Sequence, residues 1–163
     1  MNPTTRTYPT ANSLDVTVRA EMIGILNQLL ADSLDLYSQC KQAHWNVKGM
    51  NFIALHQLFD QIAEAVEPII DELGERVTAL GADAQGTVRM AAENSRLPEF
   101  PSDLDTGEQF VEITRDRVSL FGNNTREAVN TAMEAGDEAT ADLFIGIVRE
   151  MDKLTYFLEA HLR

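Results

Sequence analysis

The sequence predicts an all-α protein, a four-helix bundle with a long crossover between the second and third helices. Apolar residues recur every three or four positions in four long segments of the 163-residue chain, as on the buried face of a helix. No segment alternates as a strand does, and a hydrophobic fraction of 44% is enough for one core. We therefore predict one domain over residues 14–163, preceded by a flexible tail of residues 1–13.

The first two predicted helices are joined by a short turn. The first begins after Ser13 or Asp15, either of which is a suitable N-cap, and ends near Lys48. Asn51 is a suitable N-cap for the second helix, and Gly81 is well placed to end it. Their apolar stripes are Met22, Leu26, Leu29, Leu30, Ser33, Tyr37, Cys40 and His44 in the first helix, and Leu55, Phe59, Ile62, Val66, Ile69, Leu73, Val77 and Leu80 in the second.

Residues 81–105 contain two glycines and two prolines, with only a short helical pattern around residues 87–94. A connection of this length suits a crossover along a bundle better than a tight turn. Thr106 and Gln109 have the spacing of a capping box that opens the third helix, and Gly136 ends that helix. Asp137 is a suitable N-cap for the fourth helix, which runs almost to the C-terminus.

The composition excludes several classes of protein. The net charge of −13 disfavours nucleic acid and favours cations as partners. Cys40 is the only cysteine, so the chain has neither a disulfide framework nor a thiolate metal site, and a core position is predicted for it. No apolar run is long enough for a membrane span and the N-terminus does not resemble a signal peptide, so we expect a soluble cytoplasmic protein.

A second stripe on the second helix is acidic. No lysine or arginine occurs between Phe52 and Glu75. A solvated helix face normally mixes the two signs, because like charges four residues apart cost about 0.2–0.5 kcal/mol per pair. The stripe is either an acidic face turned to bulk water or a face that binds cations. Its members, spaced by three or four residues, are His56, Asp60, Glu64, Glu67, Asp71 and Glu75.

The histidines favour the cation-binding interpretation. His44 ends the first helix and His56 opens the acidic stripe of the second, where Asp60 follows one turn later. With Asp71 and Glu75 they make two imidazoles and three carboxylates, a ligand set that suits iron, with manganese and zinc as competitors.

These ligands cannot all meet within one straight helix. Asp60 and Asp71 are eleven residues apart, which displaces them by roughly 16 Å along the axis. The two halves would meet if the second helix packed antiparallel against its own copy across a two-fold axis, which makes two equivalent sites per dimer. The Glu-x-x-His motif of a di-iron site within one bundle occurs nowhere in the chain.

The chain resembles the Dps family (DNA protection during starvation), the mini-ferritins of the ferritin-like superfamily. The resemblance covers everything beyond the N-terminal tail, and its most specific part is the His-Trp-Asn run with the spaced second histidine. It is carried by residues 44–56 (HWNVKGMNFIALH), Asp60, Asp71, Glu75, Arg76, residues 141–144 (ADLF) and residues 151–153 (MDK).

The resemblance implies a ferritin-like four-helix bundle whose crossover carries a short helix. It implies a hollow dodecamer that oxidises Fe²⁺, with hydrogen peroxide favoured over dioxygen as the oxidant, and stores a ferric mineral. It also implies that Trp45, beside the first histidine, intercepts stray oxidising equivalents; packing at an interface is the alternative. The implied ferroxidase ligands are His44, His56 and Asp60 of one subunit with Asp71 and Glu75 of its two-fold mate.

Further acidic residues have weaker cases. Glu64 and Glu67 continue the stripe and are candidates for mineral nucleation, with ordinary solvated glutamates as the alternative. Glu134 and Asp142 lie near the junction of the last two helices, where the family builds an iron entry pore.

DNA binding is not expected to follow from the resemblance. Family members that bind DNA use a lysine-rich N-terminal tail, whereas Arg6 is the only basic side chain before Arg19 here. Without such cations the counterion-release contribution to DNA affinity is largely missing. A nucleoid-compacting, DNA-binding protein remains the alternative function, and Arg117, Arg126 and Arg149 would have to cluster on the folded surface to support it.

Overall fold

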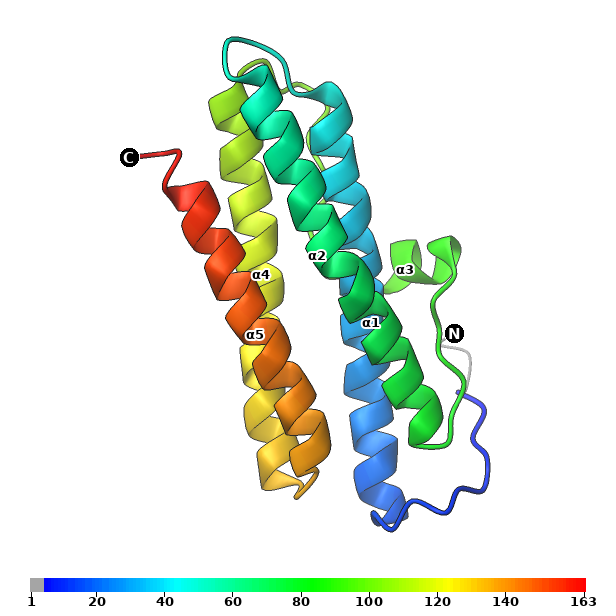
Figure 1. Cartoon of the computed structure of the whole chain (residues 1–163). Helices are drawn as coiled ribbons and strands as arrows, with labels where there is room; N and C mark the ends of the chain where they lie inside the picture. Colours follow the sequence, from blue (N-terminus) through cyan, green and yellow to red (C-terminus); the bar gives the residue numbers. More distant parts are fainter. Residues whose placement is uncertain (1–4) are drawn as a thin grey trace.

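The computed structural model describes residues 5–163 and consists of four long helices and one short one (Figure 1). Two helical hairpins, α1 with α2 and α4 with α5, pack side by side, and the short α3 packs against α1 (Figure 1). This confirms the predicted all-α bundle with a long crossover. The helices are α1 (Val16–Asn46), α2 (Phe52–Ala79), α3 (Val88–Asn94), α4 (Gly107–Glu134) and α5 (Glu138–Glu159).

The helix ends follow the predicted capping residues closely. The side chain of Asp15 accepts a hydrogen bond from the backbone N–H of Thr17, and the capping box of Thr106 and Gln109 is complete. Asp137 accepts from the N–H of Thr140 at the start of α5. Asn51 differs, because it occupies the N-cap position of α2 without a side-chain hydrogen bond. The caps fix where the helices start and hence the register of their side chains.

Buried charged groups on α1 and α4 hold the crossover against the bundle. These contacts were not predicted from the sequence. Asp32 on α1 is fully buried and accepts hydrogen bonds from the backbone N–H and the guanidinium of Arg96, the shortest at 2.6 Å. Arg117 of α4 is only 9% exposed and donates to the backbone carbonyls of Pro98 and Glu99. These contacts clamp the crossover onto the bundle.

The N-terminal segment, predicted as a flexible tail over residues 1–13, makes backbone contacts with the chain just after α2 at two of its residues. Residues 1–4 lie outside the described part of the chain. The backbone N–H of Tyr8 donates a hydrogen bond to the carbonyl of Gly81 at 2.7 Å. The backbone N–H of Asp83 donates one to the carbonyl of Arg6 at 3.1 Å. Gly81 has a φ of +92°, and a Cβ there would lie 2.8 Å from the carbonyl oxygen of Tyr8. The glycine therefore both ends α2 and admits the N-terminal segment.

None of the helices in residues 5–163 is long and apolar enough to cross a membrane. Cys40 is fully buried, as predicted, and burial raises the pKa of its thiol to about 12. The core lies between the four long helices and includes Phe59, Phe121 and Phe144, all without solvent exposure.

Candidate functional site

His44 and His56 face each other across the turn between α1 and α2. The Nδ1 of His44 lies 2.7 Å from the carbonyl oxygen of His56, and the Nδ1 of His56 lies 2.7 Å from the carbonyl oxygen of His44. A carbonyl oxygen only accepts hydrogen bonds, so each Nδ1 must carry the proton. In its neutral form, each ring with this hydrogen bond has its lone pair on Nε2, the form in which histidine binds a metal.

The two imidazoles are also held by packing. Their rings stack with centroids 3.7 Å apart and an interplanar angle of 21°. The ring of Phe52 lies 4.9 Å from that of His56. The His44 side chain is only 13% exposed. Two hydrogen bonds and this stacking fix the ring orientations before any ligand arrives.

Asp60 lies beside this pair and is paired with a lysine that the sequence reasoning missed. The Nζ of Lys41 on α1 donates a hydrogen bond to Oδ1 of Asp60. That bond lowers the pKa of Asp60, and the nearby His44 lowers it further; the same contact raises the pKa of Lys41. The carboxyl is therefore ionised throughout the neutral range. Lys41 precedes His44 by one helical turn, so the two side chains lie on the same face of α1. That spacing could have indicated that Lys41 lies near the site.

His44 and Asp60 are close without being bonded to each other. The Nδ1 of His44 is 3.9 Å from Oδ1 of Asp60, beyond hydrogen-bond distance, and its proton already goes to the His56 carbonyl. The structure thus brings His44, His56 and Asp60 into one neighbourhood, and their role as metal ligands stays a prediction.

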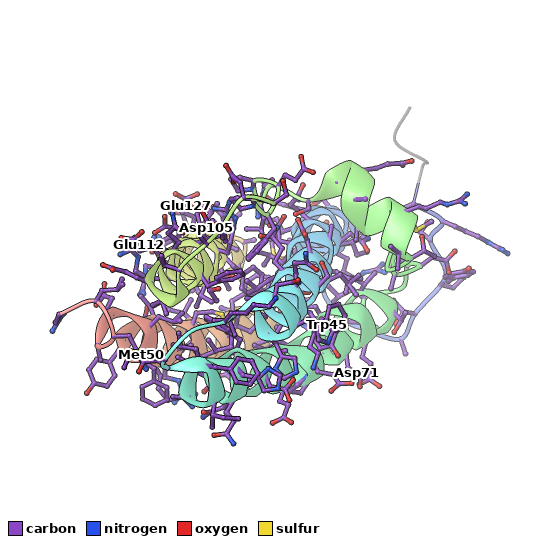
Figure 2. The ribbon with its side chains drawn as sticks, turned by 90° about the horizontal axis from the view of Figure 1, so that it is seen from above. Trp45, Met50, Asp71, Asp105, Glu112 and Glu127 are labelled. Carbon is purple, nitrogen blue, oxygen red and sulfur yellow. The ribbon has the colours of Figure 1, made fainter. Side chains whose placement is uncertain are left out.

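Trp45 lies next to this neighbourhood on α1 and is 64% exposed (Figure 2). The Nζ of Lys41 is 6.0 Å from the centroid of its ring, at the outer limit of a cation–π contact. An indole this exposed is available to solvent or to another chain.

Asp71 and Glu75 are exposed on α2 and do not join the histidines in the single chain. Between Phe52 and Ala79 the helix is unbroken, so Asp60 and Asp71 are separated by roughly 16 Å along its axis. Within residues 5–163, no three His, Cys, Asp or Glu side chains are close enough to hold a metal ion.

The remaining candidate acids are all exposed. Glu64 and Glu67 lie on α2 between the two halves of the predicted site. Glu134 ends α4 and Asp142 lies early in α5, on either side of the corner at Gly136. No side-chain contact found within residues 5–163 joins Glu134 to Asp142, so their part in a pore stays a prediction.

The comparisons with known proteins agree with the all-α fold. The sequence model of the ferritin-like domain matches residues 23–163. A DNA protection during starvation protein of Agrobacterium fabrum is 37% identical over 158 residues, which are 97% of this chain and 98% of that protein. A protein of the same name from Brevibacillus brevis is 33% identical over 138 residues, which are 85% of this chain and 92% of that protein.

Solved structures give the same picture for the fold. DpsC from Streptomyces coelicolor superposes with a TM-score of 0.90 at 29% identity, over 98% of this chain and 92% of that one. A Dps protein from Vibrio cholerae O1, described as a member of a broad superfamily of ferritin-like diiron-carboxylate proteins, gives a TM-score of 0.88 at 29% identity. The overlap covers 97% of this chain and 100% of that one.

Proposed function

The chain belongs to the ferritin-like family and, within it, to the Dps proteins, and from this premise we propose that it is a ferroxidase. Membership of this family supports a function in iron storage and protection. The substrate is ferrous iron, the oxidant is hydrogen peroxide with dioxygen as the alternative, and the ferric product is stored inside a hollow shell.

The pre-set histidine pair is the observation that carries this proposal. Both Nδ1 atoms donate hydrogen bonds to backbone carbonyls at 2.7 Å. The lone pairs of both Nε2 atoms are therefore available to bind a metal ion. An ionised carboxylate, Asp60, lies beside them. Neutral imidazole with carboxylate oxygen suits iron, and zinc or manganese can occupy the same donors.

The donors explain why oxidation is favoured here. Carboxylates are hard anionic ligands that stabilise Fe³⁺ over Fe²⁺, while a small number of neutral donors keeps the ferrous ion weakly held and free to move on. Two Fe²⁺ each lose one electron, and one hydrogen peroxide takes up both electrons and two protons to give two water molecules. Because the two electrons are delivered together, release of hydroxyl radical is reduced.

The site is complete only when two subunits meet. Asp71 and Glu75 are too far along α2 to reach the histidines of their own chain, at roughly 16 Å from Asp60 to Asp71. Antiparallel packing of α2 against its copy places His44, His56 and Asp60 of one subunit near the Asp71 and Glu75 carboxylates of the other. We expect this dimer to be the unit of a closed dodecamer.

A mixing experiment tests the shared site. One variant carries His44→Ala with His56→Ala, and the other carries Asp71→Ala with Glu75→Ala. Each is expected to be inactive alone in anaerobic loading followed by peroxide-driven Fe²⁺ oxidation. After the two are dissociated and reassembled together in equal amounts, about a quarter of all sites combine an intact half from each variant, so activity should return to about a quarter of the wild-type rate.

The control is reassembly of each variant with itself, which must stay inactive. Reassembled wild-type protein sets the full rate. If both variants stay inactive after mixing although mass measurements show mixed assemblies, the two ligand halves act within one chain and the proposal is wrong. Light scattering that reports a stable monomer would rule out both the shared site and the dodecamer.

Other exposed residues take supporting roles in this proposal. Trp45 intercepts oxidising equivalents that escape the site, which fits an indole 64% exposed beside Lys41. Glu64 and Glu67 nucleate the mineral, and Glu134 with Asp142 lines the entry pore. All four glutamate and aspartate side chains are exposed on the single chain, which leaves them available to iron.

A further inference from the structure

Large apolar side chains gather at the turn between α1 and α2 and stay exposed in the single chain. Ten large apolar side chains are exposed in residues 5–163, and four of them fall between positions 45 and 53. Ile53 is 60% exposed, and Met50 is entirely exposed. Exposed apolar side chains that cluster in this way mark a surface that meets another protein. The four are Trp45, Met50, Phe52 and Ile53.

Two of the four continue the acidic stripe of α2 at its start. Ile53 precedes His56 by three residues and Phe52 precedes it by four, which keeps these side chains on one face of the helix. The ring centroid of Phe52 lies 4.9 Å from that of His56, in agreement with this spacing. The apolar pair of Phe52 and Ile53 therefore lies one turn beyond the histidine, next to the proposed iron ligands.

The other end of the same stripe carries two small side chains. Thr78 and Ala79 follow Glu75 by three and four residues, so they lie one turn beyond the last carboxylate. Both are exposed in the single chain. One face of α2 thus has large apolar side chains at its start, iron-binding candidates along its length and small side chains at its end.

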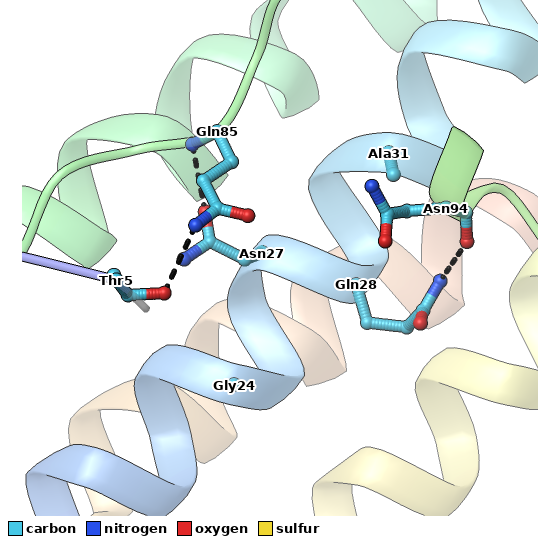
Figure 3. Close-up of a pocket in the computed structure, with 7 residues that line it drawn as sticks. All are labelled: Thr5, Gly24, Asn27, Gln28, Ala31, Gln85 and Asn94. Atoms are coloured by element: carbon cyan, nitrogen blue, oxygen red, sulfur yellow. Dashed lines mark hydrogen bonds between the residues drawn. The ribbon is translucent and has the colours of Figure 1, made fainter. Parts of the chain in front are cut away.

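The chain directly after α2 is held in place, which fixes the end of the helix. The backbone N–H of Gln85 donates to Oδ1 of Asn27 on α1 at 2.9 Å (Figure 3). The Nε2 of the same Gln85 side chain donates to Oγ1 of Thr5 at 3.0 Å (Figure 3). The two small side chains at the end of α2 therefore present a preformed surface.

The proposed shared site determines how α2 lies against its copy. In an antiparallel pair, each step forward along one helix is matched by a step back along the other. His56 and Asp60 are four residues apart, and Asp71 and Glu75 are also four apart. When Asp60 lies opposite the partner's Asp71, His56 therefore lies opposite the partner's Glu75. Both ligand pairs agree on one register.

We propose that the apolar pair docks on the two small side chains at the end of α2 of the partner subunit. Three residues beyond the ligands, Ile53 faces the partner's Thr78. Four residues beyond them, Phe52 faces the partner's Ala79. A large side chain meets a small one at each position, so the two helices can approach as closely as the ligands require. The inference rests on the proposed shared site and gives that site its register.

A second copy is the occupant because the same face of α2 carries the ligands. The carboxylates of the partner subunit reach the histidines only if its α2 covers this face, and no room is then left for another protein. The two-fold axis repeats the contact, so each dimer contains two. Each contact lies one turn beyond the ligands, on the side away from the axis, and covers that end of an iron site.

The test is a disulfide cross-link in the full-length, assembled protein, in a variant with Ile53→Cys and Thr78→Cys. These positions are roughly 38 Å apart along one α2, whereas a disulfide needs Cα atoms about 4.4–6.8 Å apart, so only two chains can be joined. After mild oxidation, most of the protein should run on a non-reducing denaturing gel as a dimer of the 18.1 kDa chain. Reductant should return it to monomer. The native Cys40 is buried and out of reach.

Ile53→Cys with Glu67→Cys is the matched control. Glu67 is exposed on the same face of α2 but lies eleven residues, or roughly 16 Å, before Thr78. This variant should stay monomeric on the same gel, as should each single-cysteine variant. Phe52→Cys with Ala79→Cys is the second pair in the proposed register, and the same cross-link is expected of it if the first pair does not assemble.

Cross-linking of the control pair would overturn the inference. So would the absence of cross-links in both designed pairs when light scattering shows that the protein is assembled. If the designed pairs fail while the mixing experiment restores iron oxidation, the shared site stands and only the register is wrong. If the mixing experiment fails as well, the shared site itself is wrong.

Discussion

Lys41 on α1 donates a hydrogen bond from its Nζ to Oδ1 of Asp60 on α2, one of the carboxylates proposed to bind iron. The two side chains are 21% and 36% exposed, so the pair is reachable from solvent. In the absence of iron, the ammonium group takes the place of a cation at this carboxylate. In the proposed site, iron has to displace this ammonium group, and we expect that to weaken ferrous binding.

Lys41→Gln is therefore expected to strengthen binding of Fe²⁺ at neutral pH by several-fold, because the carboxylate no longer has a competing cation. The change also removes the main cause that lowers the pKa of Asp60. The folded-state pKa should rise toward its ordinary value, and the pH below which iron binding fails should move upward. Anaerobic isothermal titration calorimetry across pH measures both effects.

Lys153→Gln is the matched control for that substitution. Lys153 pairs with Glu150 at 2.6 Å on α5, so the variant removes the same charge from an exposed ion pair away from the histidines. Its binding of Fe²⁺ should equal that of the wild type. Equal gains in both variants would show that net charge alone, and not the contact with Asp60, controls the affinity.

The helices and their ends could be predicted because their causes are local. The Asp15 and Asp137 caps and the capping box at Thr106 depend on side chains within a few residues of the helix start, and the apolar period depends on one helix at a time. His44, His56 and Asp60 could be placed together for the same reason, since one short turn joins their helices.

Contacts between distant segments could not be predicted in the same way. Asp32 and Arg96 are 64 residues apart. No pattern in the sequence indicates that these two charged side chains pair with each other. The docking of Tyr8 on Gly81 depends on where the crossover leaves α2. The partner of Asp71 and Glu75 is on another chain in our proposal, so neither local spacing nor the single-chain fold supplies it.

Asp137→Ala is expected to lower the free energy of unfolding by about 2–4 kcal/mol. Asp137 is 2% exposed, accepts from the backbone N–H of Thr140 at 3.0 Å and pairs with Arg76 at 2.9 Å. The substitution uncaps α5 and removes the carboxylate that pairs with the Arg76 guanidinium, which keeps only its hydrogen bond to Thr140. Urea denaturation at a fixed protein concentration measures the change, and Asp142→Ala, an exposed position on the same helix, should be near neutral. A similar loss in both variants would contradict the role given to this pair.

Cys40 should be inert to thiol reagents in the folded protein. Burial raises the pKa of its thiol to about 12, so the reactive thiolate is absent at neutral pH and the sulfur is also out of reach. The shift contributes stability that is fully present below the unfolded pKa near 9 and is lost as pH rises toward 12. Reaction with Ellman's reagent at pH 8 should require denaturant; rapid labelling of the native protein would show that the core opens.

The arginines that a DNA-binding alternative requires do not form a basic surface. Arg117 is buried at 9% exposure, and Arg126 pairs with Asp152 at 2.7 Å. Arg6 stacks 5.0 Å above the ring of Tyr8, on the segment docked against the crossover. Among these arginines, Arg6 and Arg149 are exposed without an ion pair in residues 5–163, and they lie on different segments.

We therefore predict no appreciable binding of DNA near physiological salt and neutral pH. Each phosphate contact needs a cation on the protein, and a chain with a net charge of −13 repels a polyanion. The measurement is a gel shift of plasmid DNA with chelator-treated protein at several salt concentrations. Retarded DNA at about 0.15 M salt, where the Debye length is about 8 Å, would reveal a basic surface and support the nucleoid-compacting alternative. Retardation that appears only when divalent ions are added back would instead identify the metal as a bridge between two acidic surfaces.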